Sequence, residues 1–261
     1  MPGGDLLILC YHAVSDSWPA VGAVESAALD RQLRHLLRRR YRPLTLSAAL
    51  AAGPAERRLV VTFDDAFGSV LESGLPVLQR LGVPATLFVP TDFAAEAAPM
   101  TWSTLGKWLG TPHEEELRCM SWDDIRRLAA AGWEIGSHTC SHPKLPSLER
   151  AEAADELIRS KQICEEELQR ECPTLAYPFG LHDPETVEVA REAGYRSAVT
   201  LGERLLGARQ AERPLELSRE GIYRTTRWPH FLAATSPAIG RVRRSRVYRL
   251  PVRIARTGSS R

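Results

Sequence analysis

Short apolar runs alternate along the chain with longer stretches in which apolar and polar residues follow a helical period. The apolar runs predict strands of a buried sheet at residues 6–12, 58–63, 85–90, 133–137, 174–178 and 196–200. The helical patterns lie at residues 29–40, 69–81, 121–132, 147–169 and 183–194. Strands that alternate with helices indicate an α/β protein with a mostly parallel sheet, either closed as a barrel or open and doubly wound.

Two of the predicted helices carry clear signals at their ends. Ser121 and Asp183 suit N-caps, because their side-chain oxygens can accept a hydrogen bond from a backbone N–H of the first turn. Pro184 suits the first position of the second helix. Gly132 and Gly194 follow the last turns, where a residue in the left-handed conformation commonly ends a helix.

The composition is that of a globular protein. The chain has 261 residues, of which 44% are hydrophobic and 25% are charged. No apolar run approaches the roughly 20 residues that a membrane-spanning helix needs. The N-terminal sequence has no basic leader before its short apolar run, so we expect no signal peptide. Five cysteines without a CxxC pair indicate a reduced protein, and we therefore expect a cytoplasmic location.

The charge is distributed unevenly. Residues 241–261 contain eight arginines and no acid, which leaves 26 basic and 32 acidic residues in residues 1–240. We therefore divide the chain into a main domain, residues 1–240, and an Arg-rich C-terminal segment, residues 241–261. Apolar residues alternate with the arginines in this segment as in an edge strand. Attraction of the segment to anionic lipid, as a peripheral contact, stays open, and we expect no specific binding of nucleic acid.

Polar side chains follow four of the predicted strands, at the point where each strand ends. His12 ends the first, Asp64 and Asp65 follow the second, His138 follows the fourth, and residues 177–180 end the fifth. Active sites of barrels and open parallel sheets are built at the carboxyl ends of the strands. The sequence therefore predicts a functional site at this edge.

The residue types at this edge suit a metal ion. His138 and His142 are four residues apart, a spacing that places both imidazoles on one face of a helical turn. With an aspartate from another strand end, they would form a site of two histidines and one carboxylate, as in zinc hydrolases and non-haem iron enzymes. Each part alone has a simpler interpretation, since Asp64 and Asp65 could form a turn and the histidines could be surface residues. We interpret Cys140, between the histidines, as a small buried residue.

Three motifs, taken in order, resemble those of a known family. They are TFDD (62–65), GSHTCSHPKL (136–145) and LAYPFG (175–180). Together with LCYHAVSD (9–16) and REAGYRSAVT (191–200), they are similar to the polysaccharide deacetylases, the family 4 carbohydrate esterases, over about residues 5–225. The resemblance implies an irregular (β/α) barrel in a single domain, and hydrolysis of acetyl groups on sugars with a divalent metal, most often Zn²⁺.

The resemblance also implies roles for individual residues. Asp64 matches the general base of the family, and Asp65, His138 and His142 match its metal ligands. In the third motif, Phe179 matches the position whose backbone N–H helps to hold the oxyanion.

Two positions depart from the common pattern of the family. Many members have an arginine at the start of the third motif that holds the catalytic carboxylate, and here Ala176 stands there. The AYPFG form is similar to a subgroup in which an arginine from a later strand would substitute, and Arg219 is the candidate. The usual C-terminal Leu-x-His motif, which supplies the general acid, is absent after the third motif. His12 resembles a histidine that lines the site in this subgroup, and we expect it to protonate the leaving amine or to contact substrate; His230 is a weaker candidate.

These features predict a metal-dependent deacetylase that removes an acetyl group, most often N-acetyl, from a carbohydrate or amino sugar. The alternatives are a catalytically inactive metal-binding member of the same fold, a hydrolase of another non-peptide C–N bond, and an iron(II) oxygenase. We interpret Trp102, Trp122 and Trp228 as packing residues rather than as part of the site.

Overall fold

A computed structural model describes residues 5–53, 56–102, 104–201 and 213–236. Its main sheet is parallel throughout, with strands β1 (Leu6–Tyr11), β4 (Arg42–Leu44), β5 (Arg58–Phe63), β6 (Thr86–Val89), β7 (Glu134–Ser137), β8 (Thr174–Ala176), β9 (Ser197–Leu201) and β10 (Leu217–Gly221). Two short strands, β2 (Ala13–Val14) and β3 (Ala23–Val24), pair with each other outside it.

Seven of these strands close into a ring. Neighbours follow the order β1, β10, β9, β8, β7, β6 and β5, and β1 pairs with β5 over its full length, from Leu6 beside Arg58 to Tyr11 beside Phe63. The short β4 pairs with the first half of β5. The last two residues of β5 pair with β6. The expected single-domain (β/α) barrel is confirmed, with seven strands in the closed ring.

Alternation along the strands separates two apolar layers, because successive side chains of a strand point to opposite faces. One face of each strand fills the barrel, with Leu6, Ile8, Val60, Phe88, Ala176, Val199 and Leu217 in a single cluster. Leu46 and Ala49 of helix α2 (Leu46–Ala51) complete this cluster. The other face packs under the surrounding helices, where Leu7, Leu9 and Tyr11 belong to the largest cluster.

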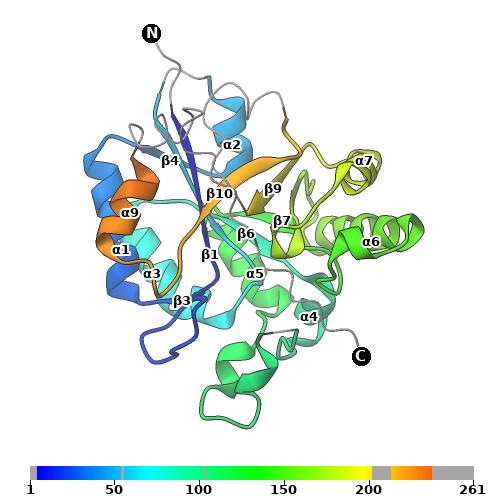
Figure 1. The fold of residues 1–261 in the computed structure, drawn as a ribbon, viewed down its shortest axis with the longest axis horizontal. Helices are drawn as coiled ribbons and strands as arrows, with labels where there is room; N and C mark the ends of the chain where they lie inside the picture. Colours follow the sequence, from blue (N-terminus) through cyan, green and yellow to red (C-terminus); the bar gives the residue numbers. More distant parts are fainter. Residues whose placement is uncertain (1–4, 54–55, 103, 202–212, 237–261) are drawn as a thin grey trace, which may run out of the picture.

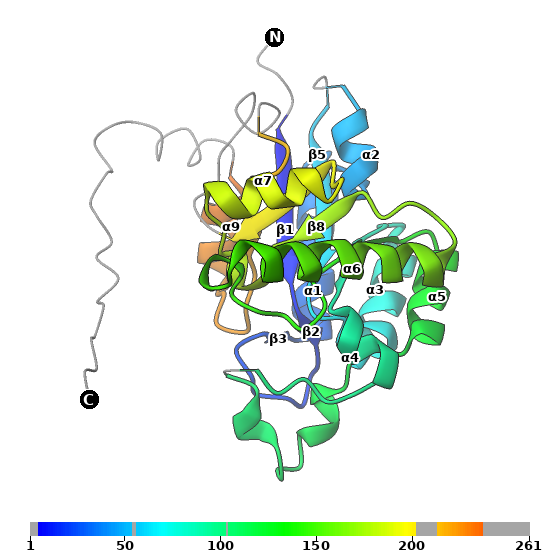
Figure 2. The same cartoon turned by 90° about the vertical axis from the view of Figure 1, so that its right-hand side faces the viewer.

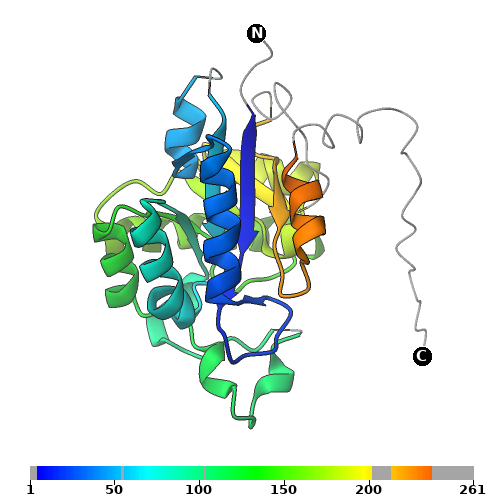
Figure 3. The same cartoon turned by 90° about the vertical axis from the view of Figure 1, so that its left-hand side faces the viewer.

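The helices surround the barrel, with α1 and α9 on one side and α6 and α7 on another (Figure 1). Their bounds are α1 (Ser26–Arg38), α3 (Leu75–Leu81), α4 (Thr91–Glu96), α5 (Trp122–Ala130), α6 (Arg150–Leu168), α7 (Pro184–Glu192) and α9 (Trp228–Thr235). Figure 3 shows α1 running alongside β1, and Figure 2 shows the length of α6 beside α7. None of the helices within the described ranges combines the length and the apolar character that a membrane crossing requires.

All five helices predicted from the sequence are present, with shifted ends. The pattern at 69–81 is a π-helical turn, Val70–Gly74, followed by α3. The helix predicted from residue 147 begins at Arg150, because Glu149 and Glu152 form a reciprocal capping box there. Among the elements missed by the sequence patterns, α2, α4 and β4 have only three to six residues, too few for a period to stand out. The eight-residue helix α9 was missed as well.

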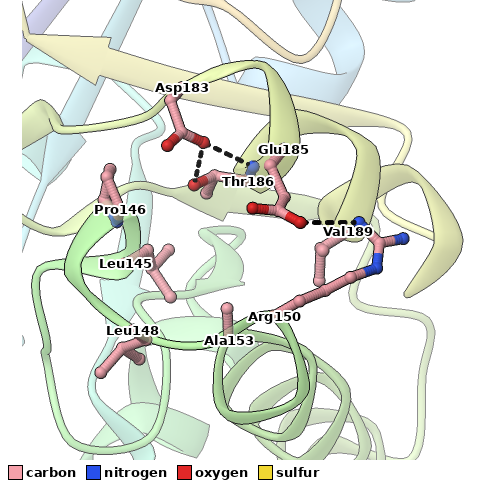
Figure 4. Close-up of a pocket in the computed structure, with 9 residues that line it drawn as sticks. All are labelled: Leu145, Pro146, Leu148, Arg150, Ala153, Asp183, Glu185, Thr186 and Val189. Atoms are coloured by element: carbon pink, nitrogen blue, oxygen red, sulfur yellow. Dashed lines mark hydrogen bonds and ion pairs between the residues drawn. The ribbon is translucent and has the colours of Figure 1, made fainter.

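The predicted helix caps are present. Ser121 Oγ accepts a hydrogen bond from the backbone N–H of Asp124. Asp183 Oδ1 accepts hydrogen bonds from both the backbone N–H and the hydroxyl of Thr186, each at 2.8 Å (Figure 4). Gly194 ends its helix with a φ of 84°, in the left-handed region. The edge strand expected in residues 241–261 lies outside the described residues, so the division of the chain at residue 240 remains a prediction.

Loops gather at the carboxyl end of the barrel. The chain between β1 and α1 and the segment between α4 and α5 lie at the same end of the molecule (Figures 1 and 2). Glu116 joins them, since its Oε1 accepts hydrogen bonds from the hydroxyls of Ser15 (2.5 Å) and Ser17 (3.2 Å). Trp18 packs edge-on against Trp108 across the same contact. These loops form one wall around the strand ends that carry the polar residues.

Candidate metal centre

Asp65, His138 and His142 converge at the carboxyl end of the barrel. Asp65 follows β5, and His138 directly follows β7. Asp65 Oδ1 lies 3.4 Å from Nε2 of His138 and 3.5 Å from Nε2 of His142. All three side chains are buried, and one ligand atom from each lies within 4.8 Å of the others. The structure therefore brings together the three residues that the sequence analysis expected to bind a metal.

The two histidines meet through a loop, and the helical turn expected from their spacing is wrong. Residues 138–142 are non-helical, and Thr139 and His142 have left-handed φ values of 68° and 62°. The hydroxyl of Thr139 accepts a hydrogen bond from the backbone N–H of His142, which closes the loop. Cys140 is fully buried, as expected, and its thiol donates to the backbone carbonyl of Glu156.

Hydrogen bonding, burial and charge act differently on the two histidines. Nδ1 of His138 lies 2.7 Å from the carbonyl oxygen of Ala176, so Nδ1 carries a proton and Nε2 is the nitrogen that faces Asp65. Burial disfavours charge on His138, but the carboxylates of Asp64 and Asp65 outweigh burial and raise the pKa of His138. Burial lowers the pKa of His142 to about 4, so its imidazole is neutral near pH 7.

The three residues fit a divalent cation. Among the residues that the structure describes, the buried Oδ1 of Asp65 has no hydrogen-bond partner. An unpaired buried carboxylate oxygen is costly, and a cation between the oxygen and the two imidazole nitrogens would offset that cost. Two imidazoles and one carboxylate, with open positions left over, are the ligand set of catalytic zinc sites.

Asp64, the neighbour of Asp65, is held by Arg219 of β10, which only β1 separates from β5 in the ring. The guanidinium of Arg219 donates to Oδ1 of Asp64 at 2.6 Å and to Oδ2 at 2.7 Å, and also to the hydroxyl of Thr62 at 3.0 Å. Burial opposes the charge of Asp64, but Arg219 and His138 outweigh burial and hold the pKa of this carboxyl well below its usual value. Asp64 is therefore a carboxylate whose orientation is fixed by two parallel hydrogen bonds.

His12 and Cys10 approach Asp64 from the end of β1. The thiol of Cys10 lies 3.4 Å from Oδ2 of Asp64, and the buried Nδ1 of His12 has no hydrogen-bond partner within the described part of the chain. Potential ligand atoms of Cys10, His12 and Asp64 also lie within 4.8 Å of one another. We assign no metal to this second group, because Arg219 already occupies both oxygens of Asp64.

Aromatic rings enclose His142, a feature that the sequence analysis missed. The indole of Trp102 stacks on the imidazole of His142, with the ring centroids 4.0 Å apart and the planes 19° apart. Phe179 contacts the same imidazole edge-on at 4.6 Å, and Phe93 supports Trp102 from behind. Trp102 therefore belongs to the site, whereas Trp122 is core and Trp228 packs against α1, as expected.

The third motif places Phe179 at the site through a tight turn. Phe179 and Gly180 both have left-handed φ values, 58° and 68°. A Cβ atom on Gly180 would lie 2.4 Å from the backbone nitrogen of Leu201, so only glycine fits there. Left-handed backbone at a non-glycine residue is strained, and such strain is common at functional sites.

Two other histidines lie apart from the metal residues. His182 stacks on Tyr177 and lies 3.6 Å from a carboxylate oxygen of Glu216. His230 is exposed on α9. The hollow between the starts of α6 and α7 contains none of Asp65, His138 and His142 (Figure 4). The described site is therefore the one at the carboxyl ends of β5 and β7.

Comparison with known proteins places the chain in a family. The sequence profile described as "Polysaccharide deacetylase" matches residues 51–198, more than half of the chain, and this protein therefore belongs to the polysaccharide deacetylase family. It is 26% identical over 200 residues to YxkH of Bacillus subtilis (strain 168), which is named as a polysaccharide deacetylase. It is 23% identical over 195 residues to a poly-beta-1,6-N-acetyl-D-glucosamine N-deacetylase of Staphylococcus aureus (strain MSSA476).

The chain spans less than two thirds of the length of these two relatives. The alignments cover 75% and 70% of this chain but only 64% and 62% of the two relatives, respectively. The fold also resembles that of the Streptococcus pyogenes deacetylase PplD, solved in complex with acetate. The TM-score is 0.74 at 21% identity, covering 90% of this chain and all of the other. The chain therefore has the family and the fold of the polysaccharide deacetylases.

Proposed function

We propose that this protein is a metal-dependent deacetylase that hydrolyses the N-acetyl group of an amino sugar in a glycan or a smaller carbohydrate. One observation carries the proposal: the metal ligands Asp65, His138 and His142 lie beside a separate carboxylate, Asp64, which Arg219 holds in place. A purely structural metal site has no use for such a carboxylate. The names of the relatives point to the same class of substrate.

Asp65, His138 and His142 would hold the metal, and Zn²⁺ is our first choice. When bound, a divalent cation supplies Lewis-acid polarisation of the acetyl carbonyl and acidification of water. Neutral imidazoles are needed for such binding. The low pKa of His142 meets that need, whereas His138, whose pKa is raised, would lose the proton of Nε2 as the cation binds.

Asp64 is the proposed general base. It takes a proton from the water that attacks the acetyl carbon. Its carboxylate is charged at neutral pH, because Arg219 holds its pKa low, and the same arginine fixes its direction. Arg219 is thus the proposed substitute for the missing arginine of the third motif, which supports the AYPFG subgroup.

The remaining steps use Phe179 and His12. The backbone N–H of Phe179 is the proposed donor to the oxyanion that develops on the acetyl oxygen. His12 is the proposed general acid: it protonates the nitrogen as the C–N bond breaks, which yields acetate and a free amine. Its position beside Asp64, with an unpaired Nδ1, supports this role.

The alternatives fit the site less well. A catalytically inactive member would not need the buried pair of Asp64 and Arg219, which costs free energy to desolvate. An iron(II) oxygenase shares the ligand types, but its usual scaffold is all-β, whereas this chain is a (β/α) barrel. A cytoplasmic location, and with it a small or lipid-linked substrate, remains our proposal from the sequence, as does peripheral membrane contact by residues 241–261.

The deciding experiment measures acetate release from a panel of N-acetylated amino sugars and oligosaccharides. Purified protein is stripped with a chelator and reloaded with Zn²⁺, and products are identified by the mass lost with one acetyl group. We expect release by the Zn²⁺-loaded protein, none by the stripped protein, and strongly reduced release by Asp64→Asn. Oxygen-dependent turnover without acetate release would refute the proposal.

A further inference from the structure

We infer that Glu156, on α6, is a positioning residue that sets the two metal-binding histidines relative to each other. The inference rests on the proposed metal site. The carboxylate of Glu156 binds the middle of the loop that joins His138 to His142. Its Oε2 accepts hydrogen bonds from the backbone N–H groups of Cys140 (2.8 Å) and Ser141 (3.0 Å), and its Oε1 accepts one from the hydroxyl of Ser141 (2.6 Å).

The loop needs such a partner because its backbone conformation is unfavourable. Thr139 and His142, on either side of the bound N–H groups, are both left-handed non-glycine residues. Such a conformation is costly for a residue other than glycine and persists only where its surroundings hold it. The two successive N–H groups converge on one acceptor oxygen, and here Oε2 of Glu156 takes that place.

The carbonyl side of the same loop is fixed independently. The backbone N–H groups of Thr91 and Asp92, at the start of α4, donate to the carbonyls of Thr139 and Cys140, each at 3.1 Å. Glu156 is the corresponding anchor on the N–H side. Without it, the fully buried N–H of Cys140 loses its partner. The loop would then be free to leave the left-handed conformation, and His142 would move away from Asp65.

The loop contacts are made by the oxygens of Glu156 and do not require its charge. An amide oxygen can accept both backbone hydrogen bonds, so Glu156→Gln keeps the geometry and removes the charge. Glu156→Leu removes both the acceptor oxygens and the charge. Glu156→Asp keeps the charge but shortens the side chain by one methylene. Glu166→Leu is the matched control, because Glu166 is exposed and lies about 15 Å further along the same helix.

The test is the Zn²⁺ affinity of each metal-free protein, measured by competition with a chromophoric chelator, together with its unfolding temperature. Partners of metal ligands typically change affinity by about 10–100-fold. We expect a loss of that size in Glu156→Leu and Glu156→Asp. Glu156→Gln and Glu166→Leu should stay near the wild type. A purely structural role would lower the unfolding temperature without weakening Zn²⁺ binding.

The outcomes separate this inference from the proposed function. Wild-type affinity in both Glu156→Leu and Glu156→Asp would overturn the positioning role, and if the leucine variant does not fold, the aspartate variant alone decides. Wild-type protein that binds Zn²⁺ but releases no acetate would refute the proposed function and leave the positioning role intact. Wild-type protein that binds no Zn²⁺ would refute both.

Discussion

Arg219 and Asp64 lie 155 positions apart in the chain and meet in a bidentate ion pair whose two hydrogen bonds measure 2.6 and 2.7 Å. Both side chains are almost fully buried. The guanidinium also lies over the ring of Phe88, inside the barrel. The proposed base therefore receives its direction from β10, the strand that pairs with β1 on the side away from β5.

Removing one partner of this pair should destabilise the fold. Arg219→Met leaves Asp64 buried without a counter-charge, and breaking a buried pair costs about 3–5 kcal/mol. The double variant Asp64→Asn/Arg219→Met should be more stable than Arg219→Met alone, because no charge remains uncompensated. The free energy of unfolding in urea is measured for the wild type, Asp64→Asn, Arg219→Met and the double variant. Together the four values give the coupling free energy between the two side chains. A double variant no more stable than Arg219→Met would contradict this account.

Asp64→Asn should separate catalysis from metal binding. The amide cannot take a proton from water, so we expect acetate release to fall by about 10²–10⁴-fold, the usual contribution of a general base. Zn²⁺ affinity should be little changed, because Asp65 and the histidines are intact. His138→Ala should lose both properties. Full activity in Asp64→Asn would mean that another group is the base.

Metal removal should lower stability as well as activity. A ligand that binds only the folded state at 100 times its dissociation constant stabilises it by about 2.7 kcal/mol. We therefore expect the unfolding temperature to fall on chelation and to recover with Zn²⁺. Asp65→Ala, which loses a ligand, should show no such recovery. Equal responses of wild type and Asp65→Ala would place the bound ion elsewhere.

Trp102 should control the titration of His142. Burial holds the pKa of His142 at about 4, and the stacked indole provides part of that burial. In metal-free Trp102→Ala, water reaches the imidazole, so the pKa should rise toward the usual value of about 6.5. Histidine NMR titration measures this shift. Trp228→Ala, at a distant helix contact, is the control, and an unshifted His142 in Trp102→Ala would show that other groups shield it.

The cap of α7 should give stability that depends on pH. Hydrogen bonds from the backbone N–H and hydroxyl of Thr186 lower the pKa of Asp183. A folded-state pKa below the unfolded value means that this stability is present at neutral pH and is lost as pH falls through the folded pKa. Asp183→Ala should cost about 0.5–2 kcal/mol at pH 7. The difference in unfolding free energy between Asp183→Ala and the wild type should shrink below about pH 4, where aspartate usually titrates. A difference that does not change with pH would contradict this account.

The position of the site at the carboxyl ends of the strands could be predicted from the sequence, because it depends only on where the strands end. Parallel strands end together, so His12, Asp64 and His138 had to lie close whatever the details of the loops. The spacing of His138 and His142 led to the right neighbours for a wrong reason, since a loop with left-handed residues brings them together. Spacing alone could not distinguish that loop from a helical turn.

The supporting contacts could not be predicted in the same way. Trp102 lies in the segment between α4 and α5, which has no apolar period, so its contact with His142 depends on how that segment crosses the site. Glu156 is one of several acidic residues along α6, and nothing in its spacing marks it as the partner of a loop. Such contacts depend on packing between elements that are distant in sequence.

The closure of the ring by β10 has a consequence for biosynthesis. Because β10 is inserted between β1 and β9, a nascent chain that stops before residue 217 leaves those two strands with unpaired edges. Such edges invite pairing with other chains. The same late strand delivers Arg219, so earlier nascent chains would also have to bury Asp64 alone. The barrel of this protein is therefore expected to close only after β10 has left the ribosome.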